Sequence, residues 1–170
     1  FAGGGLRYFD KGLIGDLEER GFVLNTEKLD KRVPKNTERA GYLLADGGMP
    51  KMREGRGEFL KDASELGIDF LSEDEDGFFM MIEGSQIDWG GHANNADYLI
   101  EEVLDFDQAV GAVLDWAQKD GETLVIVTAD HETGGFTLAA EEKKVPFQGM
   151  QRDYESIEPR FSTGGHSATM

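Results

Sequence analysis

In the first half of the chain, stretches with apolar residues at helical spacing alternate with short runs of apolar residues. Residues 11–20 and 59–66 carry apolar side chains three or four positions apart, which predicts two short amphipathic helices. Short apolar runs at 22–24 and 42–45 predict strands. The remainder of residues 26–57 is rich in charge and glycine. We therefore expect that range to be a surface insertion.

The second half has two uninterrupted apolar runs on either side of a long amphipathic stretch. Residues 77–82 read GFFMMI and residues 123–128 read TLVIVT, and such runs are typical of strands buried on both faces of a parallel sheet. Strand, helix and strand within about 50 residues predict a right-handed βαβ unit and an α/β fold. Residues 132–165 show no strong period and are expected to form a long loop. Between the runs, residues 95–119 predict a helix with a core-facing stripe of Leu99, Val103, Phe106, Val110, Val113, Leu114 and Ala117.

The charge of the chain limits its partners. Its 170 residues contain 17 Lys and Arg against 34 Asp and Glu, a net charge of −17. This charge argues against nucleic acid and anionic membrane surfaces as partners, because both are bound through Lys and Arg. No apolar stretch is long enough for a membrane-spanning helix. The excess of acidic residues favours cations as partners. The absence of cysteine excludes thiolate zinc sites and cysteine nucleophiles.

All three histidines lie beside acidic residues, glycines or both. They occur in EGSQIDWGGH at 83–92, TADHE at 128–132 and STGGH at 162–166. The first two segments follow predicted strands, at the sheet edge where open α/β folds place their ligands. Asp88 and His92 are four residues apart, a spacing that converges on one ion from a helical turn or a curled loop.

These residue types suit divalent metals. Imidazole together with carboxylate suits Zn²⁺ or another first-row ion, whereas Glu83, which has no nearby histidine, suits a harder ion such as Mg²⁺. The adjacent Asp130 and His131 either diverge toward two neighbouring ions or twist onto one. A single histidine is more often an ordinary surface or core residue, and Glu83 alone is compatible with a solvated strand end. Because all three histidines lie in such contexts, the sequence favours metal binding.

Three motifs resemble the alkaline phosphatase family. EGSQID at 83–88 followed by His92 resembles that family's Glu-Gly-x-x-Ile-Asp-x-x-x-His motif. TADH at 128–131 and TGGH at 163–166 resemble its other two metal motifs, and the glycines at 3–5 resemble the turn that precedes this region. Thr-Ala-Asp-His by itself also occurs in related mutases and metallohydrolases, but the three motifs together are specific. The resemblance covers nearly the whole chain.

The resemblance implies an α/β fold, part of a three-layer sandwich with a mostly parallel central sheet. It implies metal-dependent hydrolysis of phosphate monoesters through a phosphoryl-enzyme intermediate, and a periplasmic or secreted location. Two zinc ions and one magnesium ion belong to the intact site. Trp89 occupies a position near the phosphate in the family and is expected to line the substrate pocket. Carried over by position, the first zinc would be held by Asp88, His92 and His166, the second by Asp130 and His131, and magnesium by Glu83.

The chain also departs from the family pattern. The family's serine or threonine nucleophile, its bridging aspartate and its phosphate-clamping arginine lie in an N-terminal segment, which does not precede Phe1 here. We therefore expect residues 1–170 to be a single partial domain, the C-terminal half of an alkaline phosphatase catalytic domain whose nucleophile lies upstream. The isolated fragment is expected to be inactive and to self-associate or form a homodimer.

Two other interpretations remain open from the sequence. One is a related metallohydrolase, mutase or phosphodiesterase that uses manganese or zinc, although the Glu83 motif disfavours it. The other is a non-catalytic metal-binding remnant. A nucleophile motif in the upstream coding sequence distinguishes the phosphatase from the remnant.

Overall fold

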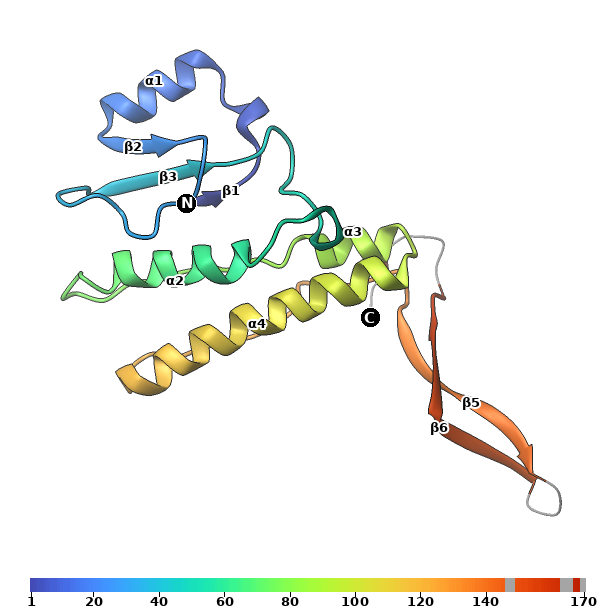
Figure 1. Cartoon of the computed structure of the whole chain (residues 1–170). Coiled ribbons are helices and arrows are strands. Elements are labelled where there is room, and N and C mark those ends of the chain that lie inside the picture. The colour runs from blue at the N-terminus through green and yellow to red at the C-terminus, as the bar shows by residue number, and fades with distance from the viewer. Residues whose placement is uncertain (146–148, 163–166, 169–170) are drawn as a thin grey trace. The chain divides into compact units, whose positions relative to one another are not determined.

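The computed structural model describes residues 1–145, 149–162 and 167–168, and these form two compact units. The first unit comprises Phe1–Gly84 and Leu104–Val125, and the second comprises Ser85–Val103 and Ile126–Met170. Helix α4 (Ala96–Asp120; Figure 1) contributes residues to both units.

A parallel three-stranded sheet organises the first unit. Strands β1 (Ala2–Gly3), β3 (Arg39–Leu43) and β2 (Phe22–Asn25) are hydrogen-bonded in that order, and both pairings are parallel. A short 3-10 helix, η1 (Leu6–Tyr8), and helix α1 (Lys11–Glu19) connect β1 to β2. The sheet with its connecting helix confirms the α/β class, and α1 and β2 confirm two predicted elements.

The core of the first unit forms where β3 meets the second helix. Tyr42 on β3, Leu66 on α2 (Phe59–Leu71) and Val33 pack together, and each is at most 9% exposed. Strand β3 and Val33 lie within the range 26–57 that was expected to be a surface insertion, so core residues occur in that range. A second 3-10 helix, η2 (Met52–Glu54), precedes α2.

The prediction of two central strands is wrong. Neither 77–82 nor 123–128 has strand hydrogen bonding, because no described strand pairs with either segment. The side chains of residues 77–82 nevertheless alternate between covered and exposed, as they do in a strand. Phe78 lies against Trp116 of α4, with ring centroids 5.9 Å apart, and Met80 packs against Gly67 of α2. Phe79 and Met81 on the opposite side are 89% and 78% exposed, so only one of the two expected faces is covered.

Helix α4 matches the predicted range, but its buried face differs from the predicted stripe. Val103 and Leu114 are 39% and 48% exposed, although Leu99 and Ala117 are buried as expected. The spacing of apolar residues alone could not predict which face of the helix is buried, because two of the buried residues are acidic. The buried positions on the helix are Tyr98, Leu99, Glu102, Asp105, Ala109 and Ala117.

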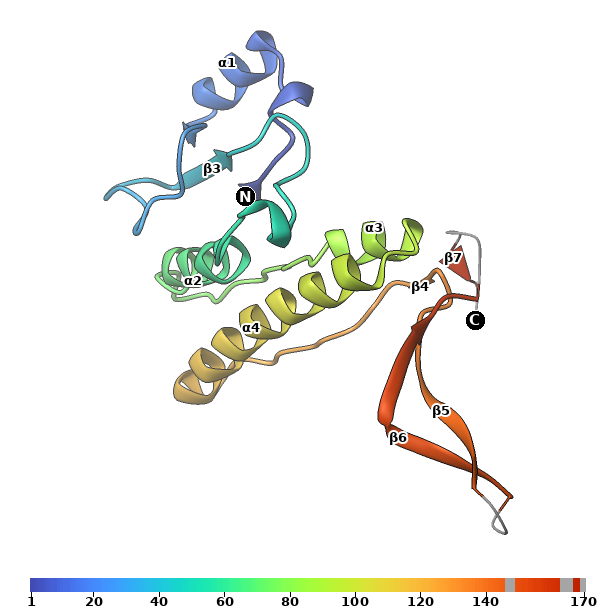
Figure 2. The same ribbon diagram turned by 45° about the vertical axis from the view of Figure 1, so that its right-hand side comes forward.

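Residues 132–165, expected as a long loop, instead contain a β-hairpin in the second unit. Strands β5 (Thr137–Val145) and β6 (Gly149–Arg160) pair antiparallel, with an irregularity in register after Ala140 (Figure 2). Strand β4 (Glu132–Thr133) pairs antiparallel with β7 (Ser167–Ala168). The β5 sequence TLAAEEKKV is largely polar in its second half and lacks the apolar alternation that marks a half-buried strand. The pattern therefore missed the hairpin.

The second unit also contains helix α3 (Gln86–His92), which precedes α4. No helix in the described part of the chain is both long and apolar enough to cross a membrane.

Candidate metal centre

Helix α3 is held closely against the first turn of α4. The buried Tyr98 hydroxyl donates a 2.5 Å hydrogen bond to Oε1 of Gln86, which is also buried. A Cβ atom at Gly90 would lie 2.8 Å from Cα of Leu99, so only glycine permits this approach of the two helices. Asn95 accepts a 3.0 Å hydrogen bond from the Tyr98 backbone N–H and caps α4. These contacts determine how α3 presents its polar side chains.

Asp88 and His92 form one pair of donors on α3. They are four residues apart, and Nε2 of His92 lies 3.4 Å from Oδ2 of Asp88. The His92 and Asp88 side chains are 45% and 37% exposed, so solvent and solutes can reach both. The spacing of four residues therefore brings the two side chains together on one side of α3.

Strand β4 passes directly beside α3 because position 91 is glycine. A Cβ atom at Gly91 would lie 2.8 Å from the carbonyl oxygen of Thr133 and 2.9 Å from its Cβ. The close approach brings Thr133 to Asp88, and its hydroxyl donates a 2.5 Å hydrogen bond to Oδ1 of that residue. Residues 45 positions apart in the sequence are joined here in one hydrogen bond.

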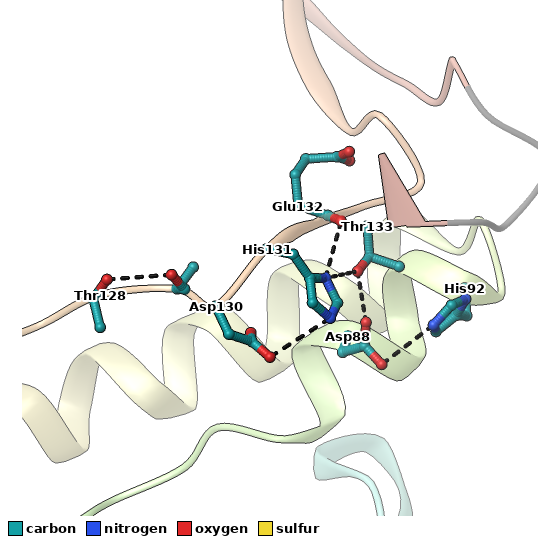
Figure 3. Close-up of polar contacts among 8 residues, drawn as sticks. Asp88, His92, Thr128, Asp130, His131, Glu132 and Thr133 are labelled. Atoms are coloured by element: carbon teal, nitrogen blue, oxygen red, sulfur yellow. Dashed lines mark hydrogen bonds and ion pairs between the residues drawn. The ribbon is translucent and has the colours of Figure 1, made fainter. Parts of the chain in front are cut away.

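Asp130 and His131 form the second pair of donors (Figure 3). Nε2 of His131 lies 3.6 Å from Oδ2 of Asp130, so these neighbours turn toward each other at the end of the 123–131 segment. On the other side of the ring, Nδ1 of His131 lies 3.1 Å from both Thr133 Oγ1 and the Glu132 carbonyl oxygen. Thr133 thus contacts both donor pairs, through Asp88 and through His131.

The remaining predicted site residues are distributed as follows. Glu83 is exposed in the first unit, whereas the two donor pairs belong to the second unit. Trp89 is 49% exposed on α3. His166 lies outside the described residues. Thr133 was missed by the sequence reasoning, and no local signal marks it, because its partner Asp88 is remote in sequence.

The donor set agrees chemically with a divalent metal. No three His, Asp or Glu side chains within the described ranges cluster in a metal-binding arrangement. The two pairs nonetheless offer two carboxylates and two imidazoles, which are ligands that Zn²⁺ accepts. The residue types present therefore agree with a zinc site, although the described residues alone do not form a complete one.

Comparison with known proteins finds one family. A family model described as alkaline phosphatase matches residues 4–158. Alkaline phosphatase 4 of Bacillus subtilis is 43% identical over 171 residues, which cover 95% of this chain and 37% of that protein. The structure of alkaline phosphatase from the Antarctic bacterium TAB5 is similar with a TM-score of 0.85 and 54% identity, over 99% of this chain and 50% of that one.

A mutant of the TAB5 enzyme, similar at the same TM-score of 0.85, has Mg bound in the M3 site. The chain spans about half the length of these solved relatives and 37% of the Bacillus subtilis protein.

Proposed function

Because the chain belongs to the alkaline phosphatase family, we propose that the protein hydrolyses phosphate monoesters with the help of bound divalent metal ions. The observation that carries this proposal is the convergence of two sequence motifs in the second unit. Asp88 and His92 come from one motif, Asp130 and His131 come from the other, and Thr133 contacts both pairs.

We assign the metal ligands by position. Asp88, His92 and His166 would hold one zinc ion, Asp130 and His131 would belong to a second, and Glu83 would bind magnesium. The carboxylate and imidazole donors support zinc in the first two sites, and the magnesium of the related TAB5 structure supports a third ion. When bound, such ions attract the phosphoryl oxygens and stabilise the developing charge on the leaving oxygen.

The residues of this chain have three tasks in that reaction. Asp88 and His92 present adjacent donors from one rigid helix, so the position of their ion depends on α3. Asp130 and His131 present donors from the segment before β4. Trp89 projects from the same helix as Asp88 and would contribute a wall of the substrate pocket.

The phosphoryl-enzyme intermediate requires a nucleophile that we place outside this sequence. We propose that residues 1–170 form the C-terminal half of a catalytic domain, in agreement with the half-length coverage of the solved relatives. The serine or threonine nucleophile would then precede Phe1. We also propose a periplasmic or secreted location for the protein.

Hydrolysis of p-nitrophenyl phosphate tests the proposal. A longer protein that contains residues 1–170 should hydrolyse it at alkaline pH, should lose activity on chelation, and should recover with zinc and magnesium. The 170-residue chain alone should show negligible turnover. The variant His92→Ala should abolish activity, whereas Gln118→Ala, at an exposed position of α4 outside the donor set, should retain it.

Two results would contradict the proposal. A longer protein that binds metal but turns over no phosphomonoester would instead be a mutase or a binding module. Robust turnover by the 170-residue chain, lost in His92→Ala, would show that the nucleophile lies within residues 1–170.

A further inference from the structure

The hydroxyl of Thr133 lies between two proposed metal ligands. Its Oγ1 atom is 2.5 Å from Oδ1 of Asp88 and 3.1 Å from Nδ1 of His131 (Figure 3). The Asp88 carboxylate keeps its other oxygen, Oδ2, on the side of His92, 3.4 Å from Nε2 of that residue. Thr133 therefore forms a hydrogen bond with one carboxylate oxygen of Asp88, and the other oxygen faces His92.

The contacts of Thr133 point to one arrangement of the protons. An ionised carboxylate only accepts hydrogen bonds, so the single hydroxyl hydrogen of Thr133 points to Asp88. Nδ1 of His131 then faces two acceptors, the lone pairs of Thr133 Oγ1 and the carbonyl oxygen of Glu132 at 3.1 Å. A nitrogen between two acceptors carries the hydrogen, so Nδ1 is the protonated nitrogen of the neutral ring. The lone pair is left on Nε2, the atom that faces Asp130.

We propose that Thr133 is a positioning residue for the metal centre, which holds His131 in the Nδ1–H tautomer and links it to Asp88. The hydroxyl joins the two donor pairs before a metal arrives, with Oδ2 of Asp88 toward His92 and Nε2 of His131 toward Asp130. A partner on the distal ring nitrogen generally sets the tautomer and orientation of a metal-binding histidine. This inference rests on the proposed function for the identity of the metal, but the tautomer itself requires no metal.

Thr133 also has a packing role that the test must separate. Its methyl group and backbone lie against Gly91, where an added Cβ would be 3.0 Å from Thr133 Cγ2. Thr133→Val keeps the branched shape and removes the hydroxyl, whereas Thr133→Ser keeps the hydroxyl and removes the methyl group. The two variants therefore distinguish the hydrogen-bond bridge from the packing.

The first measurement is ¹⁵N–¹H NMR of the histidine rings in the metal-free protein at a pH where the rings are neutral. The His131 signals are assigned by their loss in His131→Gln. The wild type and Thr133→Ser should show the hydrogen on Nδ1 of His131, and Thr133→Val should lose that preference. A wild-type His131 with its hydrogen on Nε2 would overturn the inference, even if Thr133→Val failed to fold.

The second measurement is the zinc affinity of a longer protein that contains residues 1–170, determined by competition with a chelator. Thr133→Val should weaken zinc binding about 10–100-fold, the usual effect of removing the partner of a ligating histidine. Thr133→Ser should restore most of it. An unchanged affinity in Thr133→Val, with zinc bound normally by the wild type, would refute the positioning role. A wild type that binds no zinc while its His131 has the expected tautomer would refute the proposed function instead.

Discussion

Arg56 and Asp105 form a buried ion pair within the first unit, with Nη2 of Arg56 2.8 Å from Oδ2 of Asp105. Their side chains are only 6% and 2% exposed. Arg56 also donates a 3.1 Å hydrogen bond from Nη1 to the carbonyl oxygen of Pro50. The pair therefore fastens the segment before α2 to helix α4.

Breaking this pair should strongly destabilise the protein. Asp105→Leu removes the Asp105 carboxylate from the buried Arg56 cation, which should lower the free energy of unfolding by about 3–5 kcal/mol. The double variant Arg56→Met/Asp105→Leu should recover most of that loss, because both charges of this pair are then absent. Urea denaturation measures both effects.

The exposed pair of Arg7 and Asp46 provides the matched control. Its atoms are 3.0 Å apart, but its side chains are 53% and 75% exposed. Asp46→Leu should therefore change the free energy of unfolding by no more than about 1 kcal/mol. Equal effects of Asp46→Leu and Asp105→Leu would show that burial does not determine how much the Arg56–Asp105 pair contributes to stability.

Tyr42 should make stability depend on pH in the alkaline range. Burial, together with the charge and hydrogen bond of Asp30, raises the pKa of Tyr42 to about 12. The unfolded chain loses this proton near the ordinary pKa of about 10, before the folded protein does. The stabilising contribution is thus complete below pH of about 10 and is lost as the pH rises toward 12.

Urea denaturation at a series of pH values from 9 to 11 tests this dependence. Tyr42→Phe should remove this component of the alkaline decline in the free energy of unfolding. Tyr8→Phe, at a tyrosine that is 74% exposed, is the control. The same alkaline decline in Tyr42→Phe and the wild type would count against the assignment.

A methyl group at position 91 should separate β4 from α3. Gly91→Ala places a Cβ atom 2.8 Å from the Thr133 carbonyl oxygen, so the strand must shift. Such overpacking costs about 1–3 kcal/mol, and zinc affinity should fall with it because the contact of Thr133 with Asp88 is disturbed. Thermal unfolding and chelator competition measure the two effects.

Gly111 on α4 is the matched control for that substitution. A Cβ atom at Gly111 would meet nothing within 4 Å. Gly111→Ala should therefore raise the free energy of unfolding by about 0.5–1 kcal/mol, as is usual in a helix interior. Gly91→Ala with the same stabilisation would show that β4 does not need glycine beside it.

The 170-residue chain should self-associate. Phe79, Met81 and Leu124 are 89%, 78% and 81% exposed, and the segments that carry them have no strand partner among the described residues. Exposed apolar segments with unpaired backbone groups associate with other chains. Light scattering at micromolar concentration should give a mass above that of the monomer, and Phe79→Lys should lower it.

Tyr8→Lys introduces the same charge at another exposed aromatic residue and should leave the mass unchanged. A monodisperse monomer for the unmodified chain would show that residues 1–170 form a self-sufficient unit. The proposal that they are half of a larger domain would then be abandoned.

The sequence alone was sufficient where the decisive interactions are local. The helix predicted at 11–20 forms as Lys11–Glu19, with Asp10 accepting a 2.8 Å capping hydrogen bond from the Leu13 N–H. The helix at 95–119 forms as Ala96–Asp120, and the spacing of Asp88 and His92 brings them together on α3. Helical hydrogen bonds and these side-chain pairs span only about four residues, so a short stretch of sequence specifies them.

The tertiary structure decided what depends on distant partners. The exposure of residues 77–82 alternates as it does in a strand, but no described strand pairs with them. Strand hydrogen bonds join separate segments, so the sequence of one segment cannot determine whether a partner is present. The acidic Asp105 is buried on α4 because Arg56 reaches it from 49 residues away. The sequence predicted Asp88 and His131 as metal donors, but their connection through Thr133 required the close approach of β4 to Gly91. Residue types determine which chemistry is possible, whereas packing determines which of those residues meet.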